Sequence, residues 1–400
     1  MNVPEPRLSN RPAREARRAL ALAWSVGFAM WGLLLSVGAV LPSIQTELGL
    51  SFTARSLVLA LPFLSIAVSA VPGGWLADRR GIRRSVSLGG TIAVIGAGLR
   101  AVPGPLAVLL AAGTLFGVGL GLVIPNLPKL VSLRYGPRTA GLATGIYSTG
   151  LIGGSVCGIY VTTALASAAG SWRIALTAWT ALGAVTVAGW GFLLPPEDRQ
   201  QPVGRREYRR LLGQRRLWIL AFLFAAGNAS YFFLVGAYPE YLTTRNVPVN
   251  DAFGQLALLI GTGIPAIFVA PTLSDRAGVR RPFLWGPHAL IAVLLFGVGS
   301  VPREALPLVS VGLGLAEMAI FSLALLLAVD LFPPDEVGRA SGLVISIAYV
   351  GALLGPLGFG IAMDLTHSFT AILAAFALLS VASAIAVFAL PETGGRGRRP

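Results

Sequence analysis

The sequence is poor in charge and in the residues that most often form cross-links and metal sites. Only 12% of its 400 residues are charged, against roughly 25% in soluble domains. A single cysteine, Cys157, excludes an intrachain disulfide and a cysteine-ligated metal centre. The two histidines, His288 and His367, lie far apart in the sequence, so we expect neither a metal site nor a cofactor. We expect no enzyme either, because no nucleophile, histidine and acid occur at a suitable spacing.

Lysine is almost absent, and this excludes one source of energy. The only lysine is Lys129, and Pro128 precedes it, so the Gly-Lys-Ser/Thr core of a phosphate-binding loop does not occur. The chain therefore does not hydrolyse ATP by that route. The net charge of +14 comes mostly from arginines between apolar segments, without interleaved aromatic residues. We expect no nucleic-acid partner.

Apolar residues, by contrast, are abundant. The chain is 55% hydrophobic with a mean hydropathy of +0.75, which predicts an all-α polytopic membrane protein in contact with a lipid bilayer. Twelve apolar stretches each come near the ~20 residues that cross a bilayer. They are residues 20–44, 53–77, 85–102, 105–128, 138–164, 172–194, 217–243, 252–273, 282–300, 304–331, 338–363 and 369–390.

A polar segment at the midpoint divides these stretches into two sets of six. The expected organisation is a tail, 1–19, an amino-terminal six-helix bundle, 20–194, a linker, 195–216, a carboxyl-terminal six-helix bundle, 217–391, and a second tail, 392–400. With the first tail in the cytoplasm, the only basic residues of the 31 that lie outside are Arg55, Arg100, Arg173, Arg245 and Arg303. Basic residues concentrate on the cytoplasmic side, so both termini and the linker are predicted to be cytoplasmic.

Two internal matches indicate that the second half repeats the first. Residues 74–84, GWLADRRGIRR, match residues 271–281, PTLSDRAGVRR, at six of eleven positions. Residues 138–142, RTAGL, match residues 339–343, RASGL. The offsets, 197 and 201, are about half the chain, as a duplicated and pseudo-symmetric bundle requires. Each of the two eleven-residue stretches combines an Asp, a turn-permitting Gly and several Arg between two apolar segments.

With these motifs, nearly the whole chain resembles the major facilitator superfamily of secondary transporters. Residues 74–84 are similar to the signature of the loop between its second and third helices. The resemblance implies two bundles that rock about a central site to expose it to alternate sides of the membrane. It also implies that Asp78 acts at the amino-terminal end of the eleventh helix, with Asp275 in the mirrored role. The implied gating residues are Gly74, Asp78, Arg79, Gly81, Arg83, Asp275, Arg276 and Gly278.

Other stretches resemble the cyanate-type porters of that superfamily. They are residues 97–100, AGLR, residues 117–119, GVG, and residues 125–129, PNLPK. This resemblance favours proton-coupled uptake (symport) of a small organic or inorganic anion. Proton-antiport efflux of amphipathic drugs or metabolites is the alternative. A non-transporting membrane receptor or scaffold is a third interpretation, and it predicts no polar site within the bilayer.

Three ionisable side chains inside the apolar stretches are candidates for a functional role. Glu317 lies near the middle of the tenth, where a carboxylate costs ~2.5–3.5 kcal/mol to insert. It is interpreted as a proton-coupling or substrate site, or as a structural hydrogen-bonding group. Arg100 lies near the outer end of the third and is expected to extend its guanidinium to the membrane surface, with substrate contact as the alternative. His288 is expected to form a hydrogen bond between helices, with proton relay as the alternative.

Further polar groups are candidates for lining a central site. The family resemblance implies that helices one, four, five, seven, ten and eleven supply them. Aromatic side chains with a polar group suit an amphipathic solute, but such residues also pack between helices or lie at the membrane surface. The candidates are Trp31, Asn126, Tyr147, Asn228, Tyr231 and Tyr349. The expected partners are thus a small-molecule substrate and protons, with the protein a monomer in the plasma membrane.

Overall fold

The computed structural model describes residues 13–135, 140–195, 205–333 and 336–394. These parts are helical and form fourteen α-helices and two short 3-10 helices. The α-helices are α1 (Ala13–Leu48), α2 (Phe52–Arg80), α3 (Ile82–Arg100), α4 (Leu106–Val123), α5 (Asn126–Arg134), α6 (Ala140–Ala169), α7 (Trp172–Leu193), α8 (Arg205–Leu212), α9 (Arg215–Thr244), α10 (Val249–Ala277), α11 (Arg281–Gly297), α12 (Leu306–Leu331), α13 (Val337–Thr366) and α14 (Phe369–Ala386).

Twelve membrane-crossing segments result, as the hydropathy predicts. Ten are long and apolar enough by themselves, with α4 and the start of α5 forming a single one of them. The other two are α3, which has 19 residues and basic residues at both ends, and α11, which has 17 residues. The all-α, twelve-helix prediction is therefore confirmed.

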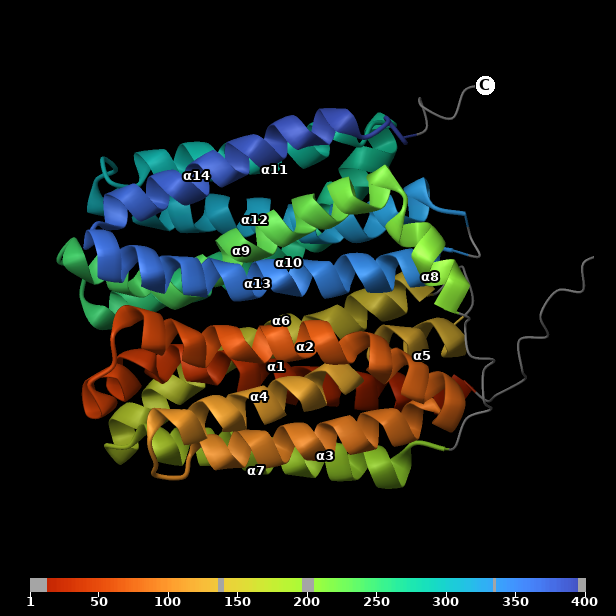
Figure 1. Cartoon of the computed structure of the whole chain (residues 1–400), viewed down its shortest axis with the longest axis horizontal. Helices are drawn as coiled ribbons and strands as arrows, with labels where there is room; N and C mark the ends of the chain where they lie inside the picture. The colour runs from red at the N-terminus through yellow and green to blue at the C-terminus, as the bar shows by residue number, and fades with distance from the viewer. Residues whose placement is uncertain (1–12, 136–139, 196–204, 334–335, 395–400) are drawn as a thin grey trace, which may run out of the picture.

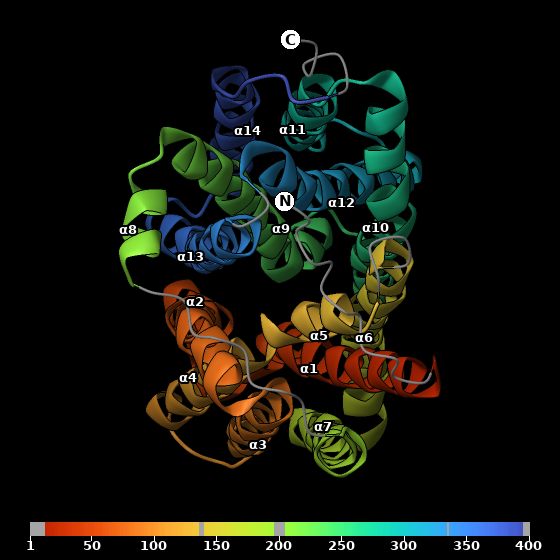
Figure 2. The ribbon, with the colours of Figure 1, turned by 90° about the vertical axis from the view of Figure 1, so that its right-hand side faces the viewer.

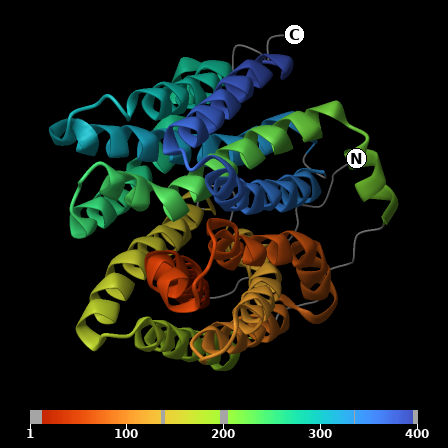
Figure 3. The ribbon, with the colours of Figure 1, turned by 60° about the vertical axis from the view of Figure 1, so that its left-hand side comes forward.

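The helices form two bundles of similar construction (Figure 1). Helices α1–α7 make one half and α9–α14 the other, and Figures 2 and 3 show the two halves one above the other. Helix α1 packs along α6 in the first half, and α9 packs along α13 in the second. A Cβ atom at Gly154 of α6 would overlap the carbonyl oxygen of Phe28, and one at Gly351 of α13 would overlap that of Ala225. Glycine at equivalent places thus allows the same close helix contact in both halves.

The fourth crossing segment is interrupted where the sequence predicts a single span, 105–128. Helix α4 ends at Val123 and α5 begins at Asn126, with Pro125 between them. Proline has no backbone N–H and its ring crowds the preceding turn, so it interrupts the helix. Helix α5 then continues to Arg134. The linker contains a further helix, α8, which the hydropathy does not predict.

Both motif glycines form the turns that the repeat predicts. Gly81, between α2 and α3, has φ of 89°, and Gly278, between α10 and α11, has φ of 67°. Only glycine adopts such angles readily, which explains its place in each copy. These turns and α8 lie at one end of the molecule, which we call the basic end and which faces the viewer in Figure 2. The other end, with Gly49 and His367 in its turns, is called the distal end. Residues 1–12 and 395–400 of the predicted tails and Arg138 of the second repeat lie outside the described residues, whereas residues 13–19 of the first tail are helical and begin α1.

Candidate functional site

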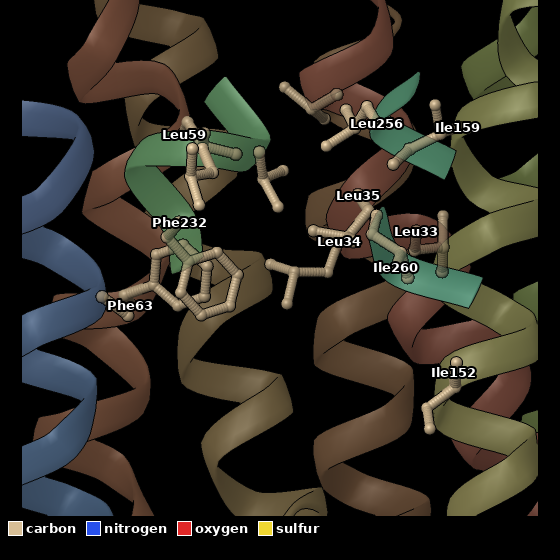
Figure 4. Close-up of a cluster of buried hydrophobic side chains, with 14 of the residues drawn as sticks. Leu33, Leu34, Leu35, Leu59, Phe63, Ile152, Ile159, Phe232, Leu256 and Ile260 are labelled. Atoms are coloured by element: carbon tan, nitrogen blue, oxygen red, sulfur yellow. The ribbon is translucent and has the colours of Figure 1, made fainter. Parts of the chain in front are cut away.

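The two bundles meet in a layer of apolar side chains (Figure 4). The ring of Phe63 in α2 lies 4.2 Å from the ring of Phe232 in α9, centroid to centroid. On its other side Phe63 stacks on Tyr349 of α13 at 6.2 Å. Leu59, one turn before Phe63, lies against Gly236 of α9. Buried apolar side chains of this layer thus pack the two bundles against each other.

At the distal end, a buried arginine joins the bundles. Arg55 of α2 is only 2% exposed, and its Nη2 lies 2.5 Å from Oε2 of Glu240 in α9. Its Nη1 donates to Oε1 of Gln45 in α1 at 2.8 Å. The guanidinium also lies over the rings of Phe52, at 5.2 Å, and Phe359 of α13, at 5.7 Å. A single side chain thus contacts three helices besides its own, two of them in the other bundle.

A second contact at the distal end caps a helix of one bundle with a carboxylate of the other. Oδ1 of Asp364, near the end of α13, accepts the backbone N–H of Phe52 at 3.0 Å. Oδ2 accepts the N–H of Thr53 at 2.9 Å. These N–H groups belong to the first turn of α2, where the helix leaves its donors unpaired and its dipole favours negative charge. The aromatic layer and these two contacts keep the distal side closed.

The sequence predicts a carboxylate at a helix amino terminus, but at the other end of the molecule and with Asp78. Asp78 forms an ion pair with Lys129 of α5, within its own bundle. Its role at the start of α13 stays a prediction, for a state in which the two approach. The sequence does not identify Asp364 as a functional residue, because a single Asp at the end of an apolar stretch indicates only where the membrane-crossing segment ends.

The second motif copy forms its own network. Nη1 of Arg280 lies 2.6 Å from Oδ1 of Asp275, and its Nε lies 2.8 Å from Oδ2 of Asp330 in α12. Asp330 is 201 residues after Lys129, the offset of the second repeat. The equivalent position is therefore positively charged in the first half, as Lys129, and negatively charged in the second half, as Asp330. In the first half it pairs directly with Asp78, and in the second half it reaches Asp275 through Arg280.

One of the last two arginines of each motif contacts another helix of its bundle. Arg83 donates from Nε to the carbonyl oxygen of Gly191 in α7 at 2.9 Å. Arg281 donates from Nε to the carbonyl oxygen of Leu390 at 3.0 Å. In each half a guanidinium satisfies a carbonyl at the end of the last helix of the bundle, where the backbone acceptors are unpaired. These residues hold the basic end of each bundle together.

Glu317 of α12 is buried in the second bundle. Its side chain is only 3% exposed, and its Oε1 has no hydrogen-bond partner among the described residues. The hydroxyl of Ser230 in α9 is also buried and lies within interaction distance of the Glu317 carboxyl. Tyr231 lies within electrostatic range. A carboxylate with an unsatisfied oxygen at this depth is a group that can take up a proton or a ligand.

Arg100 of α3 is a buried cationic residue of the first bundle. The expectation that its guanidinium reaches the membrane surface is wrong, because the residue is only 3% exposed. Its Nη1 lies 3.5 Å from the carbonyl oxygen of Leu33 in α1, and its guanidinium lies 4.0 Å from the ring centroid of Phe116 in α4. Its Nη2 has no partner in the described part of the chain. The charge is therefore held inside the bundle without a carboxylate.

Both candidates with an amide side chain, Asn126 and Asn228, take part in helix packing. The Nδ2 of Asn126 donates to the carbonyl oxygens of Gly73 and Leu122 and to Oγ of Ser85, and the side chain is fully buried. These bonds favour the packing interpretation of Asn126. Asn228 donates to the carbonyl oxygen of Ala348 at 3.0 Å and so joins α9 to α13.

The aromatic candidates lie closer to the boundary between the bundles. Tyr147 of α6 and Tyr349 of α13 are both buried and lie within electrostatic range of each other across that boundary. Trp31 and Tyr231 are half-buried at the edge of the same core. His288 is buried in α11, and its Nε2 has no hydrogen-bond partner among the described residues, although a bond between helices is expected. The structure thus brings the two tyrosines together and leaves His288 in the packing of the second bundle.

Two repeated six-helix bundles around a closed, largely apolar boundary define a membrane transporter rather than an enzyme. The Major Facilitator Superfamily model matches residues 19–300 and 264–400. The chain therefore belongs to the Major Facilitator Superfamily, as the sequence motifs indicate.

Individual proteins resemble the chain over most of its length. The "Uncharacterized transporter YycB" of Bacillus subtilis is 27% identical over 381 residues, which cover 93% of this chain and 92% of that protein. The "Cyanate transport protein CynX" of Escherichia coli is 27% identical over 345 residues, which cover 86% and 89%. A bacterial homologue of the human lysosomal transporter Spinster, solved in an inward-facing conformation, has a similar fold. Its TM-score is 0.74 at 16% identity, with coverage of 95% of this chain and 96% of that one.

Proposed function

We propose that the protein takes up a small organic or inorganic anion by alternating access, coupled to the movement of protons. The observation that carries this proposal is the guanidinium of Arg100, which is buried in the first bundle with no carboxylate partner among the described residues and with Nη2 unpaired there. A buried charge without a counter-ion is costly, and an anionic substrate lowers that cost. The similarity to a cyanate transport protein over 86% of the chain supports the same class of substrate.

Glu317 is the proposed proton site. It lies in the second bundle, so proton uptake there and anion binding near Arg100 involve both halves of the protein. When protonated, the carboxyl is neutral and remains buried at little cost, whereas the charged form needs a partner or water. Movement of the bundles can supply either one, and this links protonation to the conformational change.

The described conformation corresponds to the state closed at the distal end. Opening that end requires the Arg55–Glu240 ion pair and the Asp364 cap to separate. We also propose that the basic end faces the cytoplasm and that the protein acts as a monomer in the plasma membrane. The excess of basic residues at that end supports the orientation.

A flux assay with purified protein in liposomes tests the proposal. Cyanate, nitrate and glucuronate are supplied with and without an imposed proton gradient, and a neutral sugar is the comparison solute. We expect gradient-stimulated entry of one of the anions and a loss of at least about tenfold in Arg100→Gln. The matched control is Arg303→Gln, which removes the same charge from an exposed site. Equal entry of anions in wild type and Arg100→Gln contradicts the role of Arg100.

Efflux of amphipathic compounds by proton antiport is the second candidate. The observation that favours it is the aromatic layer of Phe63, Phe232 and Tyr349 at the bundle boundary, which suits an apolar solute with one polar group. The two functions differ in the direction of proton movement relative to the solute. Acidification of the liposome interior on solute entry supports uptake with protons, and alkalinisation supports exchange.

A further inference from the structure

The basic end has an open cavity on the flank of the first bundle. Its volume is about 540 Å³, and it is lined by Leu76, Arg79 and Arg80 of α2 and by Arg84 and Leu88 of α3. Figure 2 shows α3 on the side of the first bundle that is turned away from the second bundle. The cavity is therefore separate from the boundary where the substrate is expected.

The charges around this cavity have one sign. All three arginines are exposed, and none forms an ion pair with a described residue. Arg79 instead stacks on the ring of Trp75, with its guanidinium 4.0 Å from the ring centroid. Among the residues that the structure describes, no carboxylate lines the cavity. Three guanidinium groups that converge without a counter-charge suit a phosphate, which accepts several hydrogen bonds at once.

The equivalent place in the second half lacks these features. Ala277 occupies the position of Arg80, at the offset of 197 residues. Arg281 occupies the position of Arg84, but its Nε and Nη2 are used by the carbonyl oxygen of Leu390. Arg276, at the position of Arg79, is exposed as well, so what the first half alone has among the described residues is a set of three exposed arginines around one cavity, whereas the turn itself is common to both. The shared turn alone therefore does not explain why the first half has this set of arginines.

An apolar stripe continues from the cavity along α3. Leu88, Ile95 and Leu99 are 48%, 52% and 41% exposed, and their spacing from Arg84 places all four residues on one helix face. Trp75, on whose ring Arg79 of the cavity stacks, is 47% exposed. A tryptophan at the junction of basic and apolar surface is typical of the membrane–water interface.

We propose that this cavity binds the phosphate of an anionic glycerophospholipid, phosphatidylglycerol in chemical type, from the leaflet at the basic end. The headgroup lies among Arg79, Arg80 and Arg84, and an acyl chain follows Leu88 and the stripe beyond it. Charge complementarity and the adjoining apolar face together select a lipid over a soluble phosphate. The site holds a lipid against the α2–α3 turn, which is the gating motif of the first half.

Native mass spectrometry of the full-length protein released from mixed phosphatidylglycerol and phosphatidylcholine nanodiscs tests the proposal. We expect wild type to retain phosphatidylglycerol selectively and Arg80→Gln/Arg84→Gln to lose roughly tenfold or more in affinity. The control Arg18→Gln/Arg209→Gln removes two exposed charges elsewhere on the same end and should retain the lipid. Melting temperatures of both variants establish that they are folded.

Other outcomes overturn the proposal. Equal retention in wild type and Arg80→Gln/Arg84→Gln rules out the cavity as the site. Equal loss in the control variant means that diffuse charge, not this cavity, attracts the lipid. Displacement by inorganic phosphate at a matched concentration means a site for a soluble anion. Leu88→Ser tests the apolar part, because it should weaken retention of long-chain phosphatidylglycerol while leaving all three arginines in place.

Discussion

Arg55 of α2 and Glu240 of α9 form an ion pair across the boundary between the two bundles, with Nη2 2.5 Å from Oε2. The arginine is buried, whereas Glu240 retains about a quarter of its side-chain exposure, 26%. Removing the carboxylate leaves a buried, unpaired charge, which is more costly than losing a surface ion pair. The pair therefore favours the conformation closed at the distal end.

Glu240→Gln should weaken this closure by about 2 kcal/mol. The measurement is the rate at which a water-soluble maleimide modifies a cysteine placed at Leu59, which is buried in the closed layer, in a Cys157→Ser background. We expect several-fold faster labelling. The charge exchange Arg55→Glu/Glu240→Arg should restore slow labelling, and an unchanged rate in Glu240→Gln would show that the pair does not control opening.

Asp364→Ala should free the first turn of α2. The substitution removes both acceptors for the N–H groups of Phe52 and Thr53, and loss of a helix cap costs about 1 kcal/mol. Hydrogen exchange at these two amides should become several-fold faster, while exchange at the start of α10 serves as the internal control. Exchange that stays as slow as in wild type would mean that another group caps the helix.

Glu317→Gln should separate proton coupling from transport. The amide is close in shape to the protonated carboxyl but cannot release a proton, so gradient-driven accumulation should be lost while exchange of substrate across the membrane continues. Glu304→Gln, at an exposed position, is the control and should accumulate substrate normally. If accumulation in Glu317→Gln follows the proton gradient as in wild type, the coupling group lies elsewhere.

Asp330→Asn should destabilise the second bundle more than Asp275→Asn does. Both carboxylates bind Arg280, but the Asp330 side chain is 7% exposed and the Asp275 side chain 60%. Loss of the buried partner costs about 3 kcal/mol, and loss of the exposed one less than about 1 kcal/mol. Thermal unfolding in detergent should show a clearly lower melting temperature for Asp330→Asn alone. Equal shifts would contradict the difference in burial as the cause.

Glu392 should make the stability depend on pH in the acid range. Burial by itself raises the pKa of its carboxyl, but hydrogen bonds from the backbone N–H groups of Arg280, Gly394, Arg281 and Thr393 lower it below 4.5. A carboxyl with a lowered pKa stabilises the fold fully above its unfolded pKa, and this stability is lost as the pH falls through the lower folded value. Melting temperatures of Glu392→Gln should therefore fall less on acidification than those of wild type. Parallel curves would exclude Glu392 as a source of the dependence.

The sequence predicts the fold well because hydropathy and turn formation depend on residues that are close together in the chain. Hydropathy over about 20 residues places each crossing segment, and the turn glycines Gly81 and Gly278 follow from the need for positive φ angles. The internal match at Asp78 and Asp275 indicates the duplication before any contact is known. The prediction for Arg100 fails because the sequence gives only the position of the residue along its helix. It does not determine whether the side chain points to the membrane surface or into the bundle.

The sequence by itself thus determined the twelve membrane-crossing segments, the two halves and the uneven charge of the two ends, but not the break between α4 and α5 or the additional helix α8. Only the tertiary structure decided which polar groups meet. Arg55 and Glu240 are 185 residues apart, and Asp364 and Phe52 are 312 apart. Their contacts depend on how each helix is rotated about its axis and how closely the bundles approach. Packing over the whole molecule sets both of these, so no single stretch of sequence determines them.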